Sequence, residues 1–251
     1  MIDGEWLQLA ERVSYTPADD IEIGGYVPFL ARTGGETDAS IEHFHNAMGI
    51  GNQRREGYPR NQCIVDFDNR EGQHTHWEGD QFGLSDVSLF TAWTITHGGR
   101  YFPGISAGII ANLPTGDEDQ FLASGSPVYG MTLLMAKRIS TLPWLLFLGG
   151  SASYTDNDEM AGLDTRKTQY TGLGGIEYEW SDRLSFIAQN LTTSPIAKDC
   201  YELSKPTNEL NVGIRFRDGC HGMWEFCFQE NLFYFNNSSD VGLHLGYRCT
   251  L

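Results

Sequence analysis

The residue types best suited to chemistry lie in one long segment, residues 32–81. A short amphipathic helix is predicted over 38–48, on which Glu42, His45 and Asn46 share a face at spacings of three and four. A glutamate and a histidine placed together can hold a metal ion or exchange protons. A polar helix face hydrogen-bonded to its surroundings uses the same residues. This second interpretation is favoured, so we expect neither a metal nor a cofactor.

A histidine pair, His74 and His76, lies on a stretch predicted to be extended. Such a pair permits metal binding but requires a third ligand, which the sequence does not identify. A membrane hydrolase of the phospholipase kind would require a histidine and a serine two positions apart on a strand edge. The chain contains no His-x-Ser sequence, so we expect no enzymatic activity.

A second set of charged residues lies in segments whose apolar side chains occupy every other position. Its members alternate with those apolar residues and are Glu177, Glu179, Arg215, Arg217, Glu225 and Arg248. We expect a ladder of paired charges across the last strands, which can stiffen the wall and can also form an electrostatic constriction. If 32–81 folds inward, Arg54 and Arg55 would add positive charge there and favour small anions.

The elements that carry these charges are predicted to be strands between an apolar and an aqueous phase. In residues 209–217, Leu210, Val212, Ile214 and Phe216 occupy one face, while charged and small residues occupy the other. The same alternation recurs through most of the chain. It predicts an all-β fold, an antiparallel transmembrane β-barrel with apolar residues outside and polar residues inside.

The alternation predicts eleven strands and connections of two kinds. The strands are expected at 5–15, 21–31, 82–97, 100–113, 127–140, 143–154, 168–180, 183–193, 207–217, 223–235 and 240–251. Tight turns alternate with longer loops, as in outer-membrane barrels with periplasmic turns and outer loops. An odd number of strands would leave an open edge, so we expect about twelve strands in the full-length form. The missing strand and a signal peptide would precede Met1.

Composition limits the alternatives. The 251 residues show no linker, so one barrel domain spanning 1–251 is expected, with 32–81 as a long outer loop that could fold into the lumen. The net charge of −16 argues against nucleic-acid binding. No apolar run reaches the roughly 18 residues of a membrane helix. A soluble β-sandwich is the competing fold.

The five cysteines are an odd number, which leaves one without a partner inside the chain. Cys227 and Cys249 flank the last loop, but the alternation places them on opposite faces, which argues against a bond. A bond between Cys63 and Cys200 in the outer loops remains an alternative.

Several short motifs, taken in order, resemble a known family. They are the opening Asp3-Gly4-Glu5, the stretch Gly34-Gly35-Glu36-Thr37-Asp38, and Leu113-Pro114-Thr115-Gly116. The chain resembles, over essentially its whole length, an uncharacterised Gram-negative envelope family, domain of unknown function 3187. The resemblance implies an outer-membrane location and a barrel, and it carries no established activity.

These features favour a narrow passive channel for small solutes, because about twelve strands enclose only a modest lumen. The alternative is a non-transporting envelope protein that binds a partner or lipopolysaccharide through its loops. A lipid-modifying enzyme is the third reading. The expected surroundings are outer-membrane lipid, lipopolysaccharide and the barrel-assembly machinery.

Overall fold

The computed structural model describes residues 2–49, 60–68, 74–139, 141–160, 163–198, 200–219, 221–231 and 241–250. Seventeen strands, one α-helix and a short 3-10 helix (η2, Tyr201–Ser204) are defined within these ranges. No helix among these residues is long and apolar enough to cross a membrane.

Most strands are long and belong to one sheet. Its main members are β2 (Glu5–Ala18), β3 (Ile21–Thr33), β7 (Val87–His97), β8 (Gly104–Leu113), β9 (Val128–Arg138), β10 (Trp144–Thr155), β13 (Thr168–Glu179), β14 (Leu184–Thr193), β15 (Thr207–Asp218), β16 (Gly222–Asn231) and β17 (Val241–Cys249). The short β6 (Gln81–Leu84) also pairs with β3. The shorter elements are β1 (Ile2–Asp3), α1 (Asp38–Met48), β4 (Ile64–Asp68), β5 (His74–Glu78), β11 (Glu159–Met160) and β12 (Leu163–Asp164).

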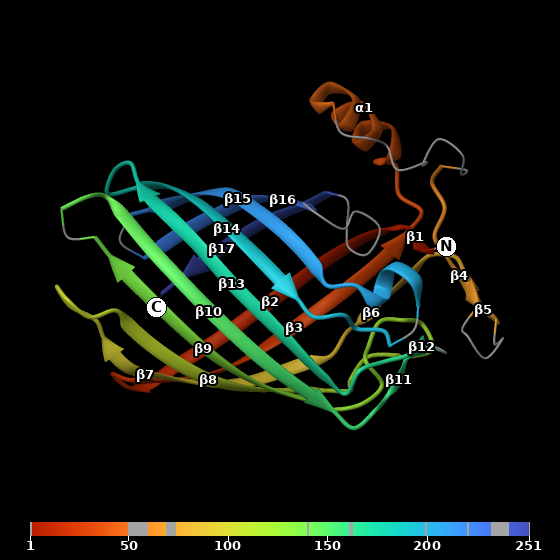
Figure 1. Cartoon of the computed structure of the whole chain (residues 1–251), viewed down its shortest axis with the longest axis horizontal. Helices are drawn as coiled ribbons and strands as arrows, with labels where there is room; N and C mark the ends of the chain where they lie inside the picture. Colours follow the sequence, from red (N-terminus) through yellow and green to blue (C-terminus); the bar gives the residue numbers. More distant parts are fainter. Residues whose placement is uncertain are drawn as a thin grey trace.

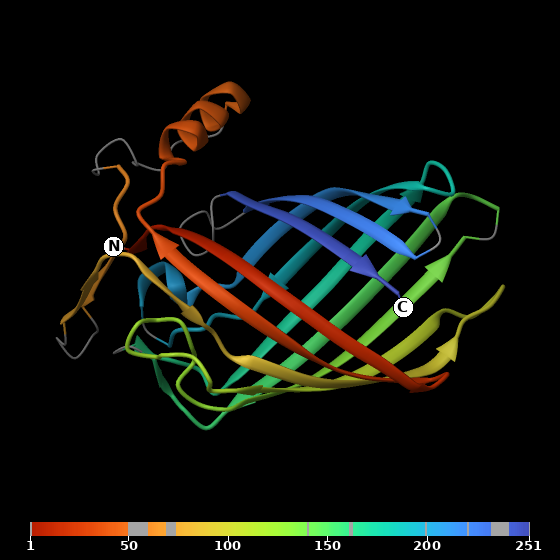
Figure 2. The same cartoon turned by 180° about the vertical axis from the view of Figure 1, so that it is seen from behind.

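The long strands follow one another in space as they do in sequence. Each pairs antiparallel with its neighbour, in the order β17-β16-β15-β14-β13-β10-β9-β8-β7-β3-β2. The sheet curls into a tilted cylinder (Figure 1). Its two edges, β2 and β17, run in the same direction (Figure 2). They could therefore pair directly only as parallel strands.

Burial in the sheet is reversed relative to a soluble protein. The buried residues of the described strands include Glu177, Ser185 and Ser88, while large apolar side chains such as Leu243 and Leu245 are 71% exposed. Exposed apolar residues lie opposite one another on neighbouring strands, for example Ile214 opposite Phe226 and Phe226 opposite Leu245. An apolar outer face and a polar inner face identify a barrel wall in contact with lipid, and confirm the predicted transmembrane β-barrel.

The two ends of the barrel differ as predicted. Short turns join β2 to β3, β7 to β8, β9 to β10, β13 to β14 and β15 to β16, and we place them at the periplasmic side. Long connections lie at the opposite, outer end (Figure 1). Each end carries outward aromatic side chains. Trp144 stacks on Tyr178 with ring centroids 4.7 Å apart near the turns, and Tyr129 pairs with Tyr154 near the outer end.

The eleven predicted strands correspond to the eleven long strands, except that one predicted strand is divided into two. The stretch predicted as a single strand over 82–97 is divided into β6 and β7 at Ser85 and Asp86. There the backbone N–H of Ser85 donates to the carbonyl of Pro28 at 2.9 Å, and Asp86 accepts hydrogen bonds from Ser124. The ladder is interrupted because Asp86 bonds to a loop instead of facing a strand.

Segment 32–81 lies at the outer mouth. The helix α1 has the predicted bounds, and it projects beyond the rim of the barrel in both views (Figures 1 and 2). The ring of Phe44 packs against the lipid-facing Phe228 of β16 at 5.5 Å. The strands β4 and β5 form a hairpin that extends past the ends of the long strands and adds β1 to make a separate three-stranded sheet. The backbone of α1 and of the hairpin therefore lies at or beyond the outer rim (Figure 1).

Candidate functional site

The predicted inward charges meet near the periplasmic end of the lumen. Strand parity turns these side chains inward on β9, β13, β15 and β16, within a few residues of the short turns. We call this set the charge belt, and its members are Arg138, Glu177, Glu179, Arg215 and Glu225. It crosses a large part of the wall and lies at one opening of the barrel.

Arg215 is the centre of the belt. Its Nη1 donates to Oε2 of Glu177 at 2.7 Å, and its Nε and Nη2 both donate to Oε2 of Glu225, at 3.0 and 2.6 Å. The other oxygen of Glu177 accepts from the hydroxyl of Ser185 at 2.6 Å. Glu177 is only 4% exposed, so its charge is removed from water and depends on these two donors.

The other arginines are arranged differently from the predicted ladder. Glu179 pairs with Arg138 of β9, with Nη2 and Oε1 2.8 Å apart, a partner that the alternation did not single out. Arg217 donates to the backbone carbonyl of Asp182 at 3.1 Å. Arg248 faces Met223 in the register, not Glu225. Arg215 and Glu225 thus form an ion pair across β15 and β16, whereas Arg248 lies opposite a residue two positions from Glu225.

This pairing changes the expected electrostatics of the lumen. The charge belt holds two arginines and three glutamates, a formal net charge of −1. The positive charge of Arg215 is compensated locally by Glu177 and Glu225, at ion-pair distances of 2.7 and 2.6 Å. The five residues of the belt therefore do not form a positive constriction by themselves. Arg217 and Arg248, which parity places on the same face of β15 and β17, add two positive charges. Arg54 and Arg55 lie outside the described residues.

On β2, β3 and β7, polar and aromatic side chains share the inner face. The guanidinium of Arg12 lies 4.5 Å from the ring centre of Phe90 and pairs with Glu22 at 2.9 Å. Tyr26, from the adjacent strand, accepts a hydrogen bond from Gln8. Side chains of this size narrow the lumen without making it apolar.

The polar cluster predicted on α1 has a structural partner. The carboxylate of Glu42 accepts from Nε of Arg60 at 3.2 Å and is bidentate with this guanidinium. Such a paired carboxylate serves to hold the helix against the following segment. The side chain of His45 lies outside what the structure describes, and for Asn46 the carbonyl accepts the backbone N–H of Gly49. A metal or acid-base role for this cluster remains a prediction without geometric support.

A buried arginine at the outer mouth was missed by the sequence reading. Arg32 is 1% exposed, and its guanidinium lies 3.8 Å from the ring centre of Trp77, 5.1 Å from that of Phe121 and 5.3 Å from that of Trp6. Its Nη2 donates to the carbonyl of Gln120 at 2.8 Å. Cation–π contacts in a water-free site are strong, so this cluster fastens the β4–β5 hairpin to the barrel. The sequence shows only an arginine at the end of a predicted strand and tryptophans in distant segments. The fold brings these residues together.

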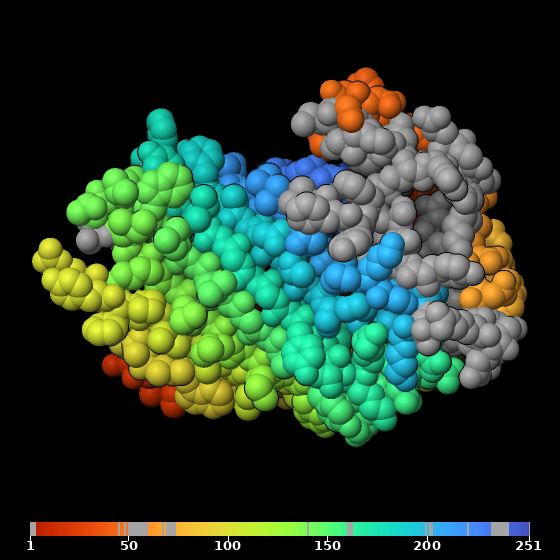
Figure 3. All heavy atoms as spheres, in the orientation of Figure 1, coloured from red at the N-terminus to blue at the C-terminus, as the bar shows by residue number. Residues whose placement is uncertain are grey.

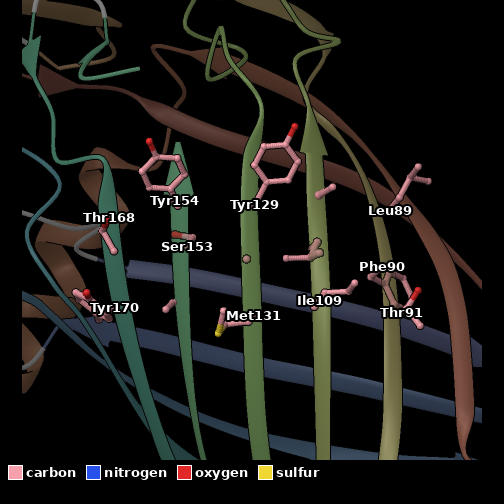
Figure 4. Close-up of a pocket in the computed structure, with 14 residues that line it drawn as sticks. Leu89, Phe90, Thr91, Ile109, Tyr129, Met131, Ser153, Tyr154, Thr168 and Tyr170 are labelled. Carbon is pink, nitrogen blue, oxygen red and sulfur yellow. The ribbon is translucent and has the colours of Figure 1, made fainter. Parts of the chain in front are cut away.

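A groove of about 680 Å³ lies on the wall formed by β7, β8, β9, β10 and β13 (Figure 4). Most of the side chains that line it point outward by parity. They include Leu89, Ile109, Tyr129, Met131, Tyr154 and Tyr170. The groove faces lipid, and its apolar lining fits acyl chains. It is separate from the charge belt on the inner face.

Cys227 and Cys249 lie on opposite faces of the wall, as the alternation predicted. Cys227 is buried on the inner face opposite His244, whereas Cys249 is exposed on the outer face. Cys63 and Cys200 are not bonded to each other. Cys200 instead packs with Leu163 and other apolar residues of the outer loops. Burial raises the pKa of the Cys200 thiol.

Comparisons with known proteins agree with this architecture. The model of a family described as "Protein of unknown function (DUF3187)" matches residues 1–251. No curated protein matches the chain. The COG4313 outer membrane channel from Pseudomonas putida F1 has a similar fold, with a TM-score of 0.59 and 12% identity, over 98% of this chain and 80% of that one.

Two further solved structures resemble the chain more distantly. The Pseudomonas putida toluene transporter TodX has a TM-score of 0.45 at 10% identity, covering 90% of this chain and 64% of that one. A Pseudomonas aeruginosa FadL homologue has a TM-score of 0.42 at 13% identity, covering 91% and 60%. The first of the three is an outer membrane channel, and the barrel fold places this chain in the outer membrane.

Proposed function

Because the chain belongs to the DUF3187 family and has the fold of an outer-membrane channel, we propose that it is a narrow passive channel for small solutes. The observation that carries the proposal is the inner face. It is polar both at the Arg12 and Glu22 pair of β2 and β3 and at the charge belt, and the charges of these two groups form ion pairs. A water-filled passage needs such a face, because polar groups without water or partners would be costly.

The position of segment 32–81 supports passage as well. The backbone of its described elements, α1 and the β4–β5 hairpin, lies beyond the ends of the long strands (Figure 1). Trp77 of the hairpin packs on Arg32 at the outer rim. The passage is narrow because the barrel has about twelve strands and because Tyr26 and Phe90 point inward. Small, polar solutes are the class that suits this interior.

The charge belt governs selectivity in this proposal. Arg215 pairs with two carboxylates at the periplasmic opening, so the native channel has only a weak preference between anions and cations. Removing that one cation leaves Glu177 and Glu225 uncompensated. Fixed negative charge in a narrow lumen attracts cations and repels anions.

The test is ion conductance of the purified protein in planar bilayers. The native protein is expected to give discrete conductance steps, and Arg215→Gln should shift the reversal potential in a salt gradient toward cation selectivity. Arg217→Gln is the matched control, since the described hydrogen bond of this guanidinium goes to a backbone carbonyl and it bridges no pair of carboxylates, and it should shift the potential less.

Absence of conductance from folded protein would contradict the proposal. The protein would then be better described by the alternative, an envelope protein that binds a partner or lipopolysaccharide through its outer loops. Equal shifts for Arg215→Gln and Arg217→Gln would retain the channel but remove the special role given to Arg215.

A further inference from the structure

The β4–β5 hairpin at the outer mouth has two faces of opposite character. Antiparallel register pairs Asp66 with His76 and Asp68 with His74, so these four side chains lie on one face. Val65 and Trp77, also opposite each other, lie on the other face. All four of these side chains are carboxylates or imidazoles, which are groups that can bind a metal ion.

The second face fixes the hairpin in place. Val65 is buried, and the ring of Trp77 stacks on the guanidinium of Arg32 at 3.8 Å and meets the ring of Phe121 edge-on at 6.2 Å. Isolated two-stranded hairpins are only marginally stable, so this anchoring is what holds the ligand-type residues in register. Their side chains face solvent, with that of His76 49% exposed.

Three donors on the first face lie close enough to share one ion. One donor atom each from Asp66, His74 and His76 lie within 4.8 Å of one another. The two imidazole rings are nearly parallel, with an interplanar angle of 8° and centroids 6.1 Å apart. The third ligand that the sequence left unidentified is thus supplied across the hairpin by the register of β4.

Neighbouring carboxylates complete the arrangement. An oxygen of Asp68 lies 2.9 Å from Nδ1 of His74, which orients this ring and leaves Nε2 available. A carboxylate on the far nitrogen is the usual support for a metal-bound histidine. Glu78, whose oxygen lies 3.9 Å from Nε2 of His76, adds a further negative charge beside the site.

We propose that Asp66, His74 and His76 bind a divalent transition-metal ion, such as Zn²⁺, on the outward surface of the hairpin at the outer mouth. Two imidazoles and a carboxylate suit zinc and its neighbours, whereas calcium and magnesium prefer oxygen ligands alone. The ion would join β4 to β5 and hold the hairpin closed. This inference is independent of whether the barrel conducts solutes.

The test is Zn²⁺ binding to the whole chain in detergent, with any affinity tag removed and metal stripped beforehand. Calorimetry should give one site, and excess Ca²⁺ should not displace the ion. His74→Ala, His76→Ala and Asp66→Asn should each weaken Zn²⁺ binding by about tenfold or more. His97→Ala is the matched control, since exposed His97 also contacts an aspartate, Asp20 at 2.8 Å, but lacks a second histidine in that pair.

Hydrogen exchange gives a second measurement that does not depend on any variant. Zn²⁺ should slow amide exchange in residues 64–68 and 74–78 and leave β16 unchanged. The proposal is overturned if the native protein shows no Zn²⁺ site, if His97→Ala weakens binding as much as His76→Ala, or if bound Zn²⁺ does not slow exchange in the hairpin.

Discussion

The barrel wall and the outer-mouth hairpin use the same antiparallel pairing for opposite purposes. In the wall, apolar side chains such as Val212 point to lipid, and charged ones such as Arg215 point inward. In the β4–β5 hairpin, the apolar face packs on the protein through Trp77, and the charged face meets water. Strand alternation therefore specifies two faces, and only the surroundings decide which face is buried.

The largest expected effect tests the wall. Val212 and Asn211 are neighbours on β15 at the same depth, with Val212 toward lipid opposite Phe228 and Asn211 toward the lumen opposite Gln229. Val212→Arg should reduce the free energy of unfolding by about 2–4 kcal/mol, because a charge enters hydrocarbon. Asn211→Arg should cost much less. Unfolding by denaturant in lipid vesicles measures both, and equal costs would refute the assignment of the faces.

A smaller effect tests the hairpin. Trp77→Ala removes the ring that lies 3.8 Å from the buried guanidinium of Arg32. We expect a loss of about 1–2 kcal/mol, confined to the outer mouth, because a desolvated cation–π contact and apolar area are lost together. Hydrogen exchange should accelerate in β4 and β5 and remain unchanged in β15. Acceleration across the whole barrel would show that mouth and wall unfold as one unit.

The smallest effect concerns a thiol of the outer loops. Burial raises the pKa of Cys200, so less of it is thiolate at neutral pH, and the thiolate is the reactive form. Alkylation of Cys200 should therefore be slow at pH 7 and become faster as the pH rises. The same thiol in the denaturant-unfolded protein serves as the reference in mass-spectrometric labelling. Rapid labelling of Cys200 at neutral pH would indicate that the outer loops open frequently.

The same contrast explains what sequence could predict. The wall was predictable because a period of two places every side chain on one of two faces, so Arg215 and Glu225 could be paired from their positions alone. The partnership of Glu179 with Arg138 was not, because it spans a strand lying between β9 and β13. Such contacts depend on the tilt and curvature of the sheet, which the alternation does not encode.

The outer mouth was less accessible to sequence analysis. His74 and His76 were recognised as a pair, but their companion Asp66 depends on the register of a hairpin within a predicted loop. The Arg32 cluster joins residues from β2, β3, β5 and the connection before β9. Nothing in the spacing of Arg32 relative to these aromatic residues brings them together, and only the folded barrel does.

The distance between the outward aromatic side chains at the two ends gives the hydrophobic thickness of the membrane that suits the barrel. Trp144 and Tyr154 both point outward from β10, the first near the turns and the second near the outer end. Roughly ten residues separate them, about 33 Å along a strand at ~3.3 Å per residue. A strand tilt of about 40° reduces this to a height of about 25 Å, the usual apolar band of an outer-membrane barrel. A thicker bilayer would have to thin locally at this protein, so hydrophobic thickness should govern where the protein inserts and how stable it is there.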